Sequence, residues 1–128
     1  MSGTSLDGID ISIITTNGIK ISDFEPNFFI DFTSKLKKKL LNFFNSKDKL
    51  YLDQNFLDDL NLEFSKEYAY SLLKFLKKND VDLIGFHGQT IKHDPKNKLT
   101  IQLGDGQLIS NILRKKLVCN FRKNDIIN

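Results

Sequence analysis

The chain of 128 residues has no tryptophan, two prolines, one cysteine and no long apolar run. A single cysteine, Cys119, excludes an internal disulfide, and its apolar neighbours predict a buried structural thiol in a reducing compartment. Without a run of roughly 18 apolar residues, no membrane span is expected. The polar N-terminus does not have the pattern of a signal peptide, so we expect a cytoplasmic protein.

Several catalytic motifs are also missing. The sequence has no Gly-Lys-Ser/Thr ending of a Walker A loop, no G-x-G-x-x-G, no G-x-S-x-G, no C-x-x-C and no H-E-x-x-H. We expect no metal site held by protein side chains alone, because His87 and His93 have no cysteine or paired histidine at ligand spacing.

The charge balance is modest, with 19 basic and 16 acidic residues and a net charge of +3. Lys35 and Lys37 to Lys39 form a basic cluster that is interrupted by Leu36 and followed by Leu40. This spacing favours a solvated helix face over a phosphate-binding patch. We therefore expect no nucleic-acid partner.

The first half predicts strands followed by two helices, within a length suited to one domain. Apolar residues alternate over 9–13 and 19–22, and Asn17-Gly18 between them is a strong hairpin signal. A further edge strand over 28–32 completes an antiparallel meander. Helical spacing and capping residues predict one helix from Thr33 or Ser34 to about Phe44 and another from Asp53 to about Lys78.

The second half predicts strands that alternate with helices. The strands span 81–86, 99–103 and 117–121, with a turn over 93–98 and a helix of about ten residues after Asp105. Such alternation favours parallel pairing through right-handed crossovers. The fold class is therefore α/β, with a mixed sheet and flanking helices.

The first ten residues concentrate two glycines, hydroxyls and two carboxylates directly before a strand. Backbone N–H groups and hydroxyls in such a turn can surround phosphate oxygens, and carboxylates can hold a hydrated Mg²⁺ ion. The segment is interpreted as a nucleotide-phosphate loop between two strands. The alternative is an ordinary surface turn, since the same residue types are common in turns.

A second polar segment, His87 to Thr90, follows the predicted strand 81–86. Ligand contacts in α/β folds gather at the carboxyl ends of strands, and these side chains suit a sugar's hydroxyls and amide. The alternative is a structural histidine and glutamine that close a loop. Asp105 is better explained as a helix cap. Arg122 could clamp a carboxylate or phosphate, or be a solvated terminal charge.

Taken in order, four segments resemble one family, the anhydro-N-acetylmuramic acid kinases. Residues 1–10 resemble its opening signature, and residues 85–91 match its G-x-H-G-Q-T segment. Residues 100–105 are similar to its T-L-Q-I-G-D, and residues 118–126 resemble a diverged V-x-D-F-R-x-x-D-I. Four segments in the right order are far more specific than one.

The resemblance implies part of the N-terminal lobe of an actin, hexokinase and Hsp70 type of ATPase fold. It implies an ATP-dependent kinase that hydrolyses the 1,6-anhydro ring of the amino sugar and phosphorylates O6, with ATP and Mg²⁺ as cofactors. The residues that carry over as ATP-binding are Gly3, Thr4, Ser5, Leu6, Asp7, Gly8, Ile9 and Asp10. Those that carry over as substrate-binding are His87, Gly88, Gln89, Thr90 and Arg122.

The sequence departs from the family pattern in ways that shape these expectations. Asn120 stands where the family has Asp, and Asn124 where it has Arg. The family's Gly-Gly-Gln-Gly segment and the Asp-Thr-Gly-Pro-Gly segment with its general base would lie beyond Asn128. We therefore expect residues 1–128 to be one incomplete N-terminal ATP-binding lobe, inactive alone and without the second lobe. Two other hypotheses are a non-catalytic nucleotide- or sugar-binding module and a decayed gene product.

Overall fold

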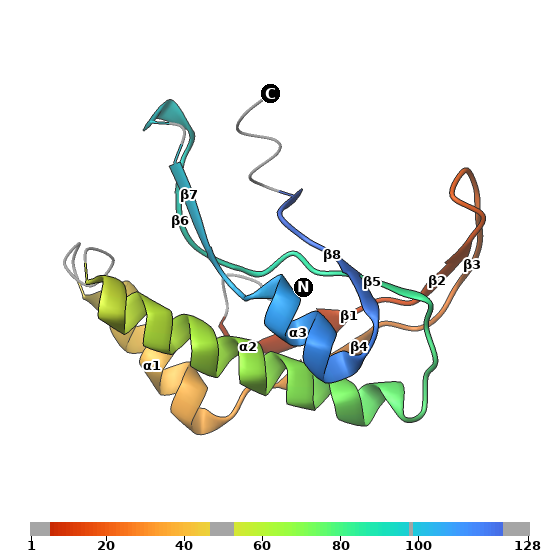
Figure 1. Ribbon diagram of the computed structural model, residues 1–128, viewed down its shortest axis with the longest axis horizontal. Coiled ribbons are helices and arrows are strands. Elements are labelled where there is room, and N and C mark those ends of the chain that lie inside the picture. The colour runs from red at the N-terminus through yellow and green to blue at the C-terminus, as the bar shows by residue number, and fades with distance from the viewer. Residues whose placement is uncertain (1–5, 47–52, 98, 122–128) are drawn as a thin grey trace.

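The computed structural model describes residues 6–46, 53–97 and 99–121 (Figure 1). Within these ranges the chain is a mixture of short strands and three α-helices. The elements, in order, are β1 (Gly8–Ile11), β2 (Ile14–Thr16), β3 (Ile21–Phe24), β4 (Phe28–Asp31), α1 (Ser34–Asn45), α2 (Gln54–Leu76), β5 (Leu83–Gly85), β6 (Gln89–Asp94), the 3₁₀ turn η2 (Pro95–Asn97), β7 (Leu99–Leu103), α3 (Gly106–Leu113) and β8 (Lys116–Val118).

The first four strands form one long bent hairpin rather than the predicted meander. β1 pairs antiparallel with β4, and β2 pairs antiparallel with β3, so β3 and β4 together make the return arm. The Glu25 amide donates to the Ile13 carbonyl at 3.0 Å between the two ladders. Pro26 follows at once, and because proline has no N–H to donate it favours a bend in the return arm. The predicted strand 9–13 accordingly ends early, with β1 at Ile11, and the separate strand β2 begins just beyond it at Ile14.

The three helices begin where their capping residues predict. Thr33, Asp53 and Asp105 each accept a hydrogen bond from a backbone N–H three residues later. These side chains satisfy donors that have no partner inside the first turn of a helix. α2 ends at Leu76, close to the predicted end, and α3 has eight residues rather than about ten.

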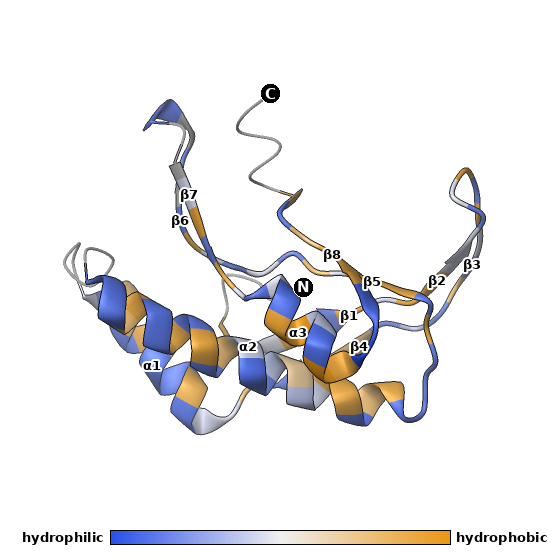
Figure 2. Ribbon diagram, viewed as in Figure 1, coloured by the Kyte–Doolittle hydropathy of each residue, from blue (hydrophilic) through white to orange (hydrophobic). Residues whose placement is uncertain are grey.

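The apolar faces of the helices meet β1 and the β6–β7 hairpin in one core. Hydrophobic and hydrophilic residues alternate around α1 and α2 (Figure 2), as expected for helices with one buried face. Phe32 and Phe64 contact edge to face, with ring centroids 5.6 Å apart, and Tyr68 contacts Phe86 in the same way at 4.8 Å. Among the described residues, the fully buried apolar side chains include Ile9, Leu36, Leu40, Leu60, Phe64, Ala69 and Ile109.

The second half contains both kinds of strand pairing. β5 and β8 are parallel, as predicted, with α3 immediately before β8. β6 and β7 are antiparallel, which corrects the prediction of parallel pairing throughout. No strand was predicted over β6, because residues 87–90 are polar and were placed after a strand, and residues 93–98 favoured a turn, which is present as η2. β5 and β8 are also shorter than predicted.

The predicted mixed sheet is replaced, in the described ranges, by four separate two-stranded ladders. The β2–β3 and β6–β7 hairpins extend away from the helices at opposite ends of the molecule (Figure 1). Both strands of the β2–β3 hairpin are exposed along their whole length. No helix in the described part of the chain is long and apolar enough to span a bilayer.

The basic cluster lies on α1, as the helix-face interpretation predicted. Lys35 and Lys39 both pair with Glu63 of α2, and Lys37 pairs with Asp31 at 2.8 Å. The two lysines hold the pKa of the Glu63 carboxyl below its ordinary value by donating hydrogen bonds to it. These lysines therefore connect α1 to its neighbours.

Candidate functional site

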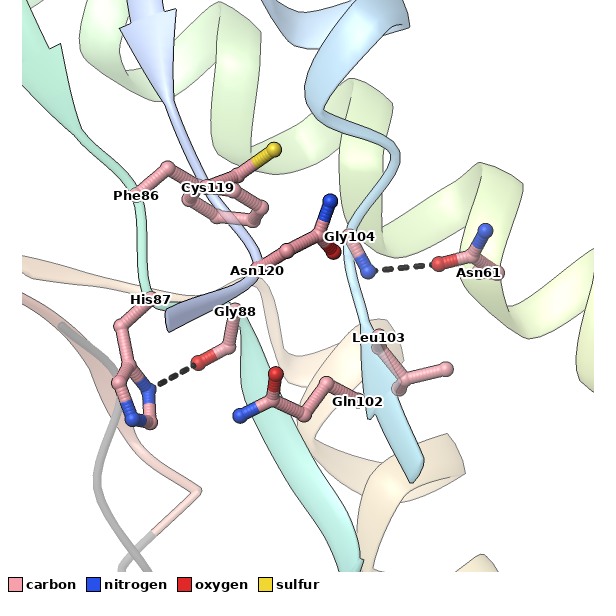
Figure 3. A pocket seen from close by; sticks show the side chains of 9 residues that line it. All are labelled: Asn61, Phe86, His87, Gly88, Gln102, Leu103, Gly104, Cys119 and Asn120. Atoms are coloured by element: carbon pink, nitrogen blue, oxygen red, sulfur yellow. Dashed lines mark hydrogen bonds between the residues drawn. The ribbon is translucent and has the colours of Figure 1, made fainter. Parts of the chain in front are cut away.

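A pocket of about 200 Å³ lies where the polar segments of the second half meet (Figure 3). β5 ends at Gly85 and its parallel partner β8 ends at Val118, so the residues that follow both strands leave the ladder at one edge. β7 and α2 complete the walls. The lining residues are Asn61, Phe86, His87, Gly88, Gln102, Leu103, Gly104, Cys119 and Asn120.

The edge is extended by one more backbone hydrogen bond. The Phe86 amide donates to the Val118 carbonyl at 2.8 Å, which keeps the two chains together just before the pocket. Asn120 follows with a left-handed φ of 65°, a conformation that asparagine tolerates better than most residues. Figure 3 shows its side chain directed toward the loop at Gly104.

Close packing of β6 on β7 shapes the opposite wall. Gln89 is opposite Leu103 in the register, and the Gln102 Nε2 donates to the Thr90 Oγ1 at 3.2 Å. Gly88 precedes this ladder, and a Cβ atom there would lie 2.7 Å from the Leu103 carbonyl oxygen. The residue at 88 must therefore be glycine for the two segments to approach this closely.

The predicted substrate-binding residues occupy two different positions. His87 and Gly88 line the pocket, and the His87 Nδ1 lies 3.0 Å from the Gly88 carbonyl oxygen. Gln89 is 2% exposed and does not line the pocket, and its Nε2 donates to the Thr90 carbonyl at 3.3 Å. Thr90 does not line the pocket, and its Oγ1 accepts the hydrogen bond from Gln102, which does. Arg122 lies outside the described residues.

Seven of the nine lining residues were not predicted from the sequence to belong to a site, and four of these seven have polar or thiol side chains. Gln102 and Asn120 belong to segments that carried the family resemblance, so a signal for them was present. Asn61 gave a weaker signal, as a polar residue beside the apolar stripe of α2. Cys119 was expected to be buried, but the structure leaves it partly exposed at the pocket wall.

The pocket is polar but carries no strongly charged side chain. Among its nine lining residues none is Asp, Glu, Lys or Arg, whereas Asn61, Gln102 and Asn120 each bring a carboxamide. A carboxamide both donates and accepts hydrogen bonds. The arrangement suits the hydroxyl and amide groups of a neutral polar ligand better than it suits a phosphate.

The predicted phosphate loop is only partly within the described residues. Gly3, Thr4 and Ser5 lie outside them. The side chains of Leu6 and Ile9 belong to the hydrophobic core, so only their backbone groups could reach a ligand. A Cβ atom at Gly8 would lie 2.3 Å from the Ile30 carbonyl oxygen, which gives this glycine a packing role at the start of β1.

Two carboxylates of this segment, Asp7 and Asp10, are exposed. The Asp7 carbonyl accepts from the Phe32 amide at 2.9 Å, which fixes the backbone where it enters β1. Leu6 precedes it with a left-handed φ of 57°, a conformation rare for a branched side chain and more frequent at functional sites. Carboxylate oxygens are the ligand type that a hydrated Mg²⁺ ion accepts, although no group of three or more metal-ligating side chains lies among the described residues.

These features define an α/β protein with a polar ligand pocket at the carboxyl ends of its parallel strands. Residues 1–128 match the family model described as anhydro-N-acetylmuramic acid kinase. The chain therefore belongs to the anhydro-N-acetylmuramic acid kinase family, which confirms the resemblance of its four segments. Membership implies the actin, hexokinase and Hsp70 type of fold.

Individual relatives give the extent of the similarity. The chain is 40% identical over 136 residues to the anhydro-N-acetylmuramic acid kinase of Pelagibacter ubique, covering 100% of this chain and 36% of that protein. It is 31% identical to the enzyme of the same name from Rhodopseudomonas palustris, covering 98% and 36%. The relative from Agrobacterium fabrum is also 31% identical, with 100% and 36% covered. The chain thus spans about a third of the length of these curated relatives.

Proposed function

We propose that this chain is the N-terminal portion of a cytoplasmic ATP-dependent kinase acting on anhydro-N-acetylmuramic acid. The reaction adds water across the 1,6-anhydro bond and transfers the γ-phosphoryl group of ATP to O6, giving N-acetylmuramate 6-phosphate. Its physiological place is cell-wall recycling and amino sugar catabolism. The observation that carries the proposal is the family match over all of residues 1–128.

The residues of the opening segment would hold the nucleotide. Gly3 to Asp10 would surround the phosphates of ATP, with backbone N–H groups rather than the buried side chains of Leu6 and Ile9 making the contacts. The exposed carboxylates of Asp7 and Asp10 suit a hydrated Mg²⁺ ion. When bound, the magnesium nucleotide supplies the transferred phosphoryl group and neutralises its charge.

The neutral pocket would receive the sugar. His87 and Gly88 line it directly, and the carboxamides around them match the hydroxyl and acetamido groups of an amino sugar. Gln89 and Thr90 would act from behind the wall, and Arg122 is proposed as a partner for the sugar's carboxylate. This role for the pocket is consistent with its lack of strong charges.

A general base and the second lobe are proposed to lie beyond Asn128. Phosphoryl transfer depends on positioning and charge stabilisation around the nucleotide, which one lobe alone does not supply. The polypeptide from the complete open reading frame should release ADP only when both ATP and anhydro-N-acetylmuramic acid are present. Residues 1–128 alone should release none.

The test compares these two polypeptides in an ADP-release assay, with mass spectrometry to identify N-acetylmuramate 6-phosphate. N-Acetylmuramic acid with an intact reducing end serves as the control sugar. No turnover by the complete reading frame would overturn the kinase proposal. Sugar-dependent ADP release by residues 1–128 alone would instead overturn the placement of the base beyond Asn128. Saturable ATP binding by a complete frame without turnover would favour the non-catalytic binding module.

A further inference from the structure

Two polar residues of α2 hold the loop that closes one side of the pocket. Asn61 and Ser65 are one helical turn apart, within the helix face that packs on α3 and β7. The Asn61 Oδ1 accepts from the Gly104 amide at 2.6 Å, and the Ser65 Oγ accepts from the Asp105 amide at 2.8 Å. We name these two hydrogen bonds, with their four residues, the α2 latch.

A third hydrogen bond joins the two α2 residues of the latch. The Ser65 hydroxyl donates to the Asn61 backbone carbonyl at 2.6 Å, so its proton is used inside α2. Its oxygen accepts from the Asp105 amide. Ser65 is fully buried. The Gly104 and Asp105 amides are partly buried, so an amide that loses its acceptor on α2 is incompletely solvated and the loop is expected to shift.

The loop held by the latch has little freedom to take another shape. Gly104 has a φ of 120°, and a Cβ atom there would lie 2.1 Å from the ring of Phe86. Asp105 caps α3 through its side chain while its amide is bound by Ser65. The latch therefore sets where β7 stops, where α3 starts and how far both stand from α2.

The position of this loop determines the shape of the pocket. Asn61 and Gly104 both line it, and Figure 3 shows the Asn61 side chain reaching from α2 to the Gly104 amide. Asn120 points toward the same loop from the end of β8. A loop released from α2 would move relative to Gly88 and Asn120 on the facing walls.

We propose that Asn61 and Ser65 are positioning residues for the sugar pocket. The inference rests on the proposed function, because it assigns the pocket to the sugar. Ser65 does not line the pocket, so it acts only through the backbone of Asp105. Asn61 lines the pocket and in addition acts through the backbone of Gly104, so Ser65 gives the cleaner test. The latch thus sets affinity for the sugar and leaves affinity for ATP unchanged.

The experiment uses the polypeptide from the complete open reading frame, titrated calorimetrically with anhydro-N-acetylmuramic acid and separately with ATP. Ser65→Ala and Asn61→Leu should each weaken sugar binding roughly tenfold, because a partly buried amide loses its acceptor and the loop shifts, with ATP binding unchanged. Asn61→Asp keeps the acceptor and should restore most of the affinity. Ser110→Ala is the matched control, because the Ser110 hydroxyl donates to the Lys115 carbonyl at 2.7 Å and does not line the pocket.

The outcomes separate this inference from the function on which it rests. Wild-type protein that binds no sugar overturns the proposed function. Wild-type binding with equal sugar affinity in Ser65→Ala overturns the α2 latch alone, and so does an equal loss in Ser110→Ala. A loss of sugar and ATP affinity together shows a general structural effect and also overturns it. If Asn61→Leu does not fold, Ser65→Ala and Asn61→Asp decide the question.

Discussion

Gly18 lies in the β2–β3 hairpin, and Gly104 lies in the loop between β7 and α3, which we call the pocket loop. Both have a left-handed φ, of 87° and 120° respectively. Each glycine follows a strand at a point where the chain turns. The sequence pattern alone therefore does not distinguish the two positions. The surroundings of the two glycines differ. A Cβ atom at Gly18 would meet nothing within 4 Å, whereas one at Gly104 would enter the ring of Phe86.

The difference separates two kinds of region. The β2–β3 hairpin is held by local hydrogen bonds, such as those from the Ile19 and Lys20 amides to the Asn17 side chain. The pocket loop is held by two residues of α2 that lie 40 and 43 positions earlier in the chain than their partners. Substitutions in the hairpin should therefore have local effects, and substitutions in the loop should affect both stability and the pocket.

Gly104→Ala should produce the largest effect. The added methyl group enters a ring that is 2% exposed, and alanine disfavours the backbone angle, so we expect a loss of about 3 to 4 kcal/mol in unfolding free energy. Urea denaturation measures the loss, and calorimetry with the anhydro sugar should show abolished binding. A Gly104→Ala variant as stable as wild type would show that the pocket loop accommodates an added methyl group as readily as the β2–β3 hairpin does.

Gly88→Ala should come next. Its methyl group would meet the Leu103 carbonyl oxygen, and relief requires β6 and β7 to separate, at a cost of about 2 to 3 kcal/mol. Sugar affinity should fall while ATP affinity is kept, measured by the same two titrations. Unchanged sugar affinity in a folded variant would contradict the assignment of this wall to the sugar.

The buried hydroxyl of Tyr68 should make the folded protein less stable at alkaline pH. Burial raises the pKa of its hydroxyl to about 12, so the unfolded chain loses this proton first as pH rises above about 10. The contribution is fully present below pH 10 and should decline by about 2 to 3 kcal/mol as pH approaches 12. Urea midpoints measured across this range should fall less steeply in Tyr68→Phe.

The exposed Tyr70 supplies the control for that titration. Tyr70→Phe should leave the alkaline slope of the wild-type protein unchanged, because its ring is largely in solvent. Equal slopes in Tyr68→Phe and wild type would show that the contact between Tyr68 and Phe86 does not exclude water.

Gly18→Ala should have the smallest effect. Only the backbone angle opposes it, which costs about 1 kcal/mol, and the methyl group stays in solvent. Sugar and ATP affinities should both match wild type. An effect as large as that of Gly104→Ala would remove the distinction between the two regions.

Local features were the most predictable from the sequence. The caps at Thr33, Asp53 and Asp105 and the turn at Asn17-Gly18 were all predicted and are confirmed. Each depends on interactions within four residues of the chain, so the pattern contains all that is needed. The family was also predictable, because its motifs are contiguous segments.

Strand partners were less predictable. The strand at 28–32 was expected as the third strand of a meander, yet β4 pairs with β1 as the continuation of the β3 arm. β6 was missed because His87 to Thr90 are polar, and its partner β7 supplies the pairing that its own residues do not indicate. Strand pairing depends on which strand edges remain available after the helices have packed. The hydrophobic periodicity of one segment contains no information about its partner.

For the candidate site, the sequence by itself indicated His87 and Gly88 and determined the family motifs around them, since these are readable as residue types, and both residues line the pocket. Only the tertiary structure decided that Gln89 is buried behind the wall and that Asn61 joins the pocket from α2. The reason is physical. A hydrogen bond between residues 43 positions apart, such as that of Asn61 with Gly104, exists only after the hydrophobic face of α2 has packed against β7 and α3.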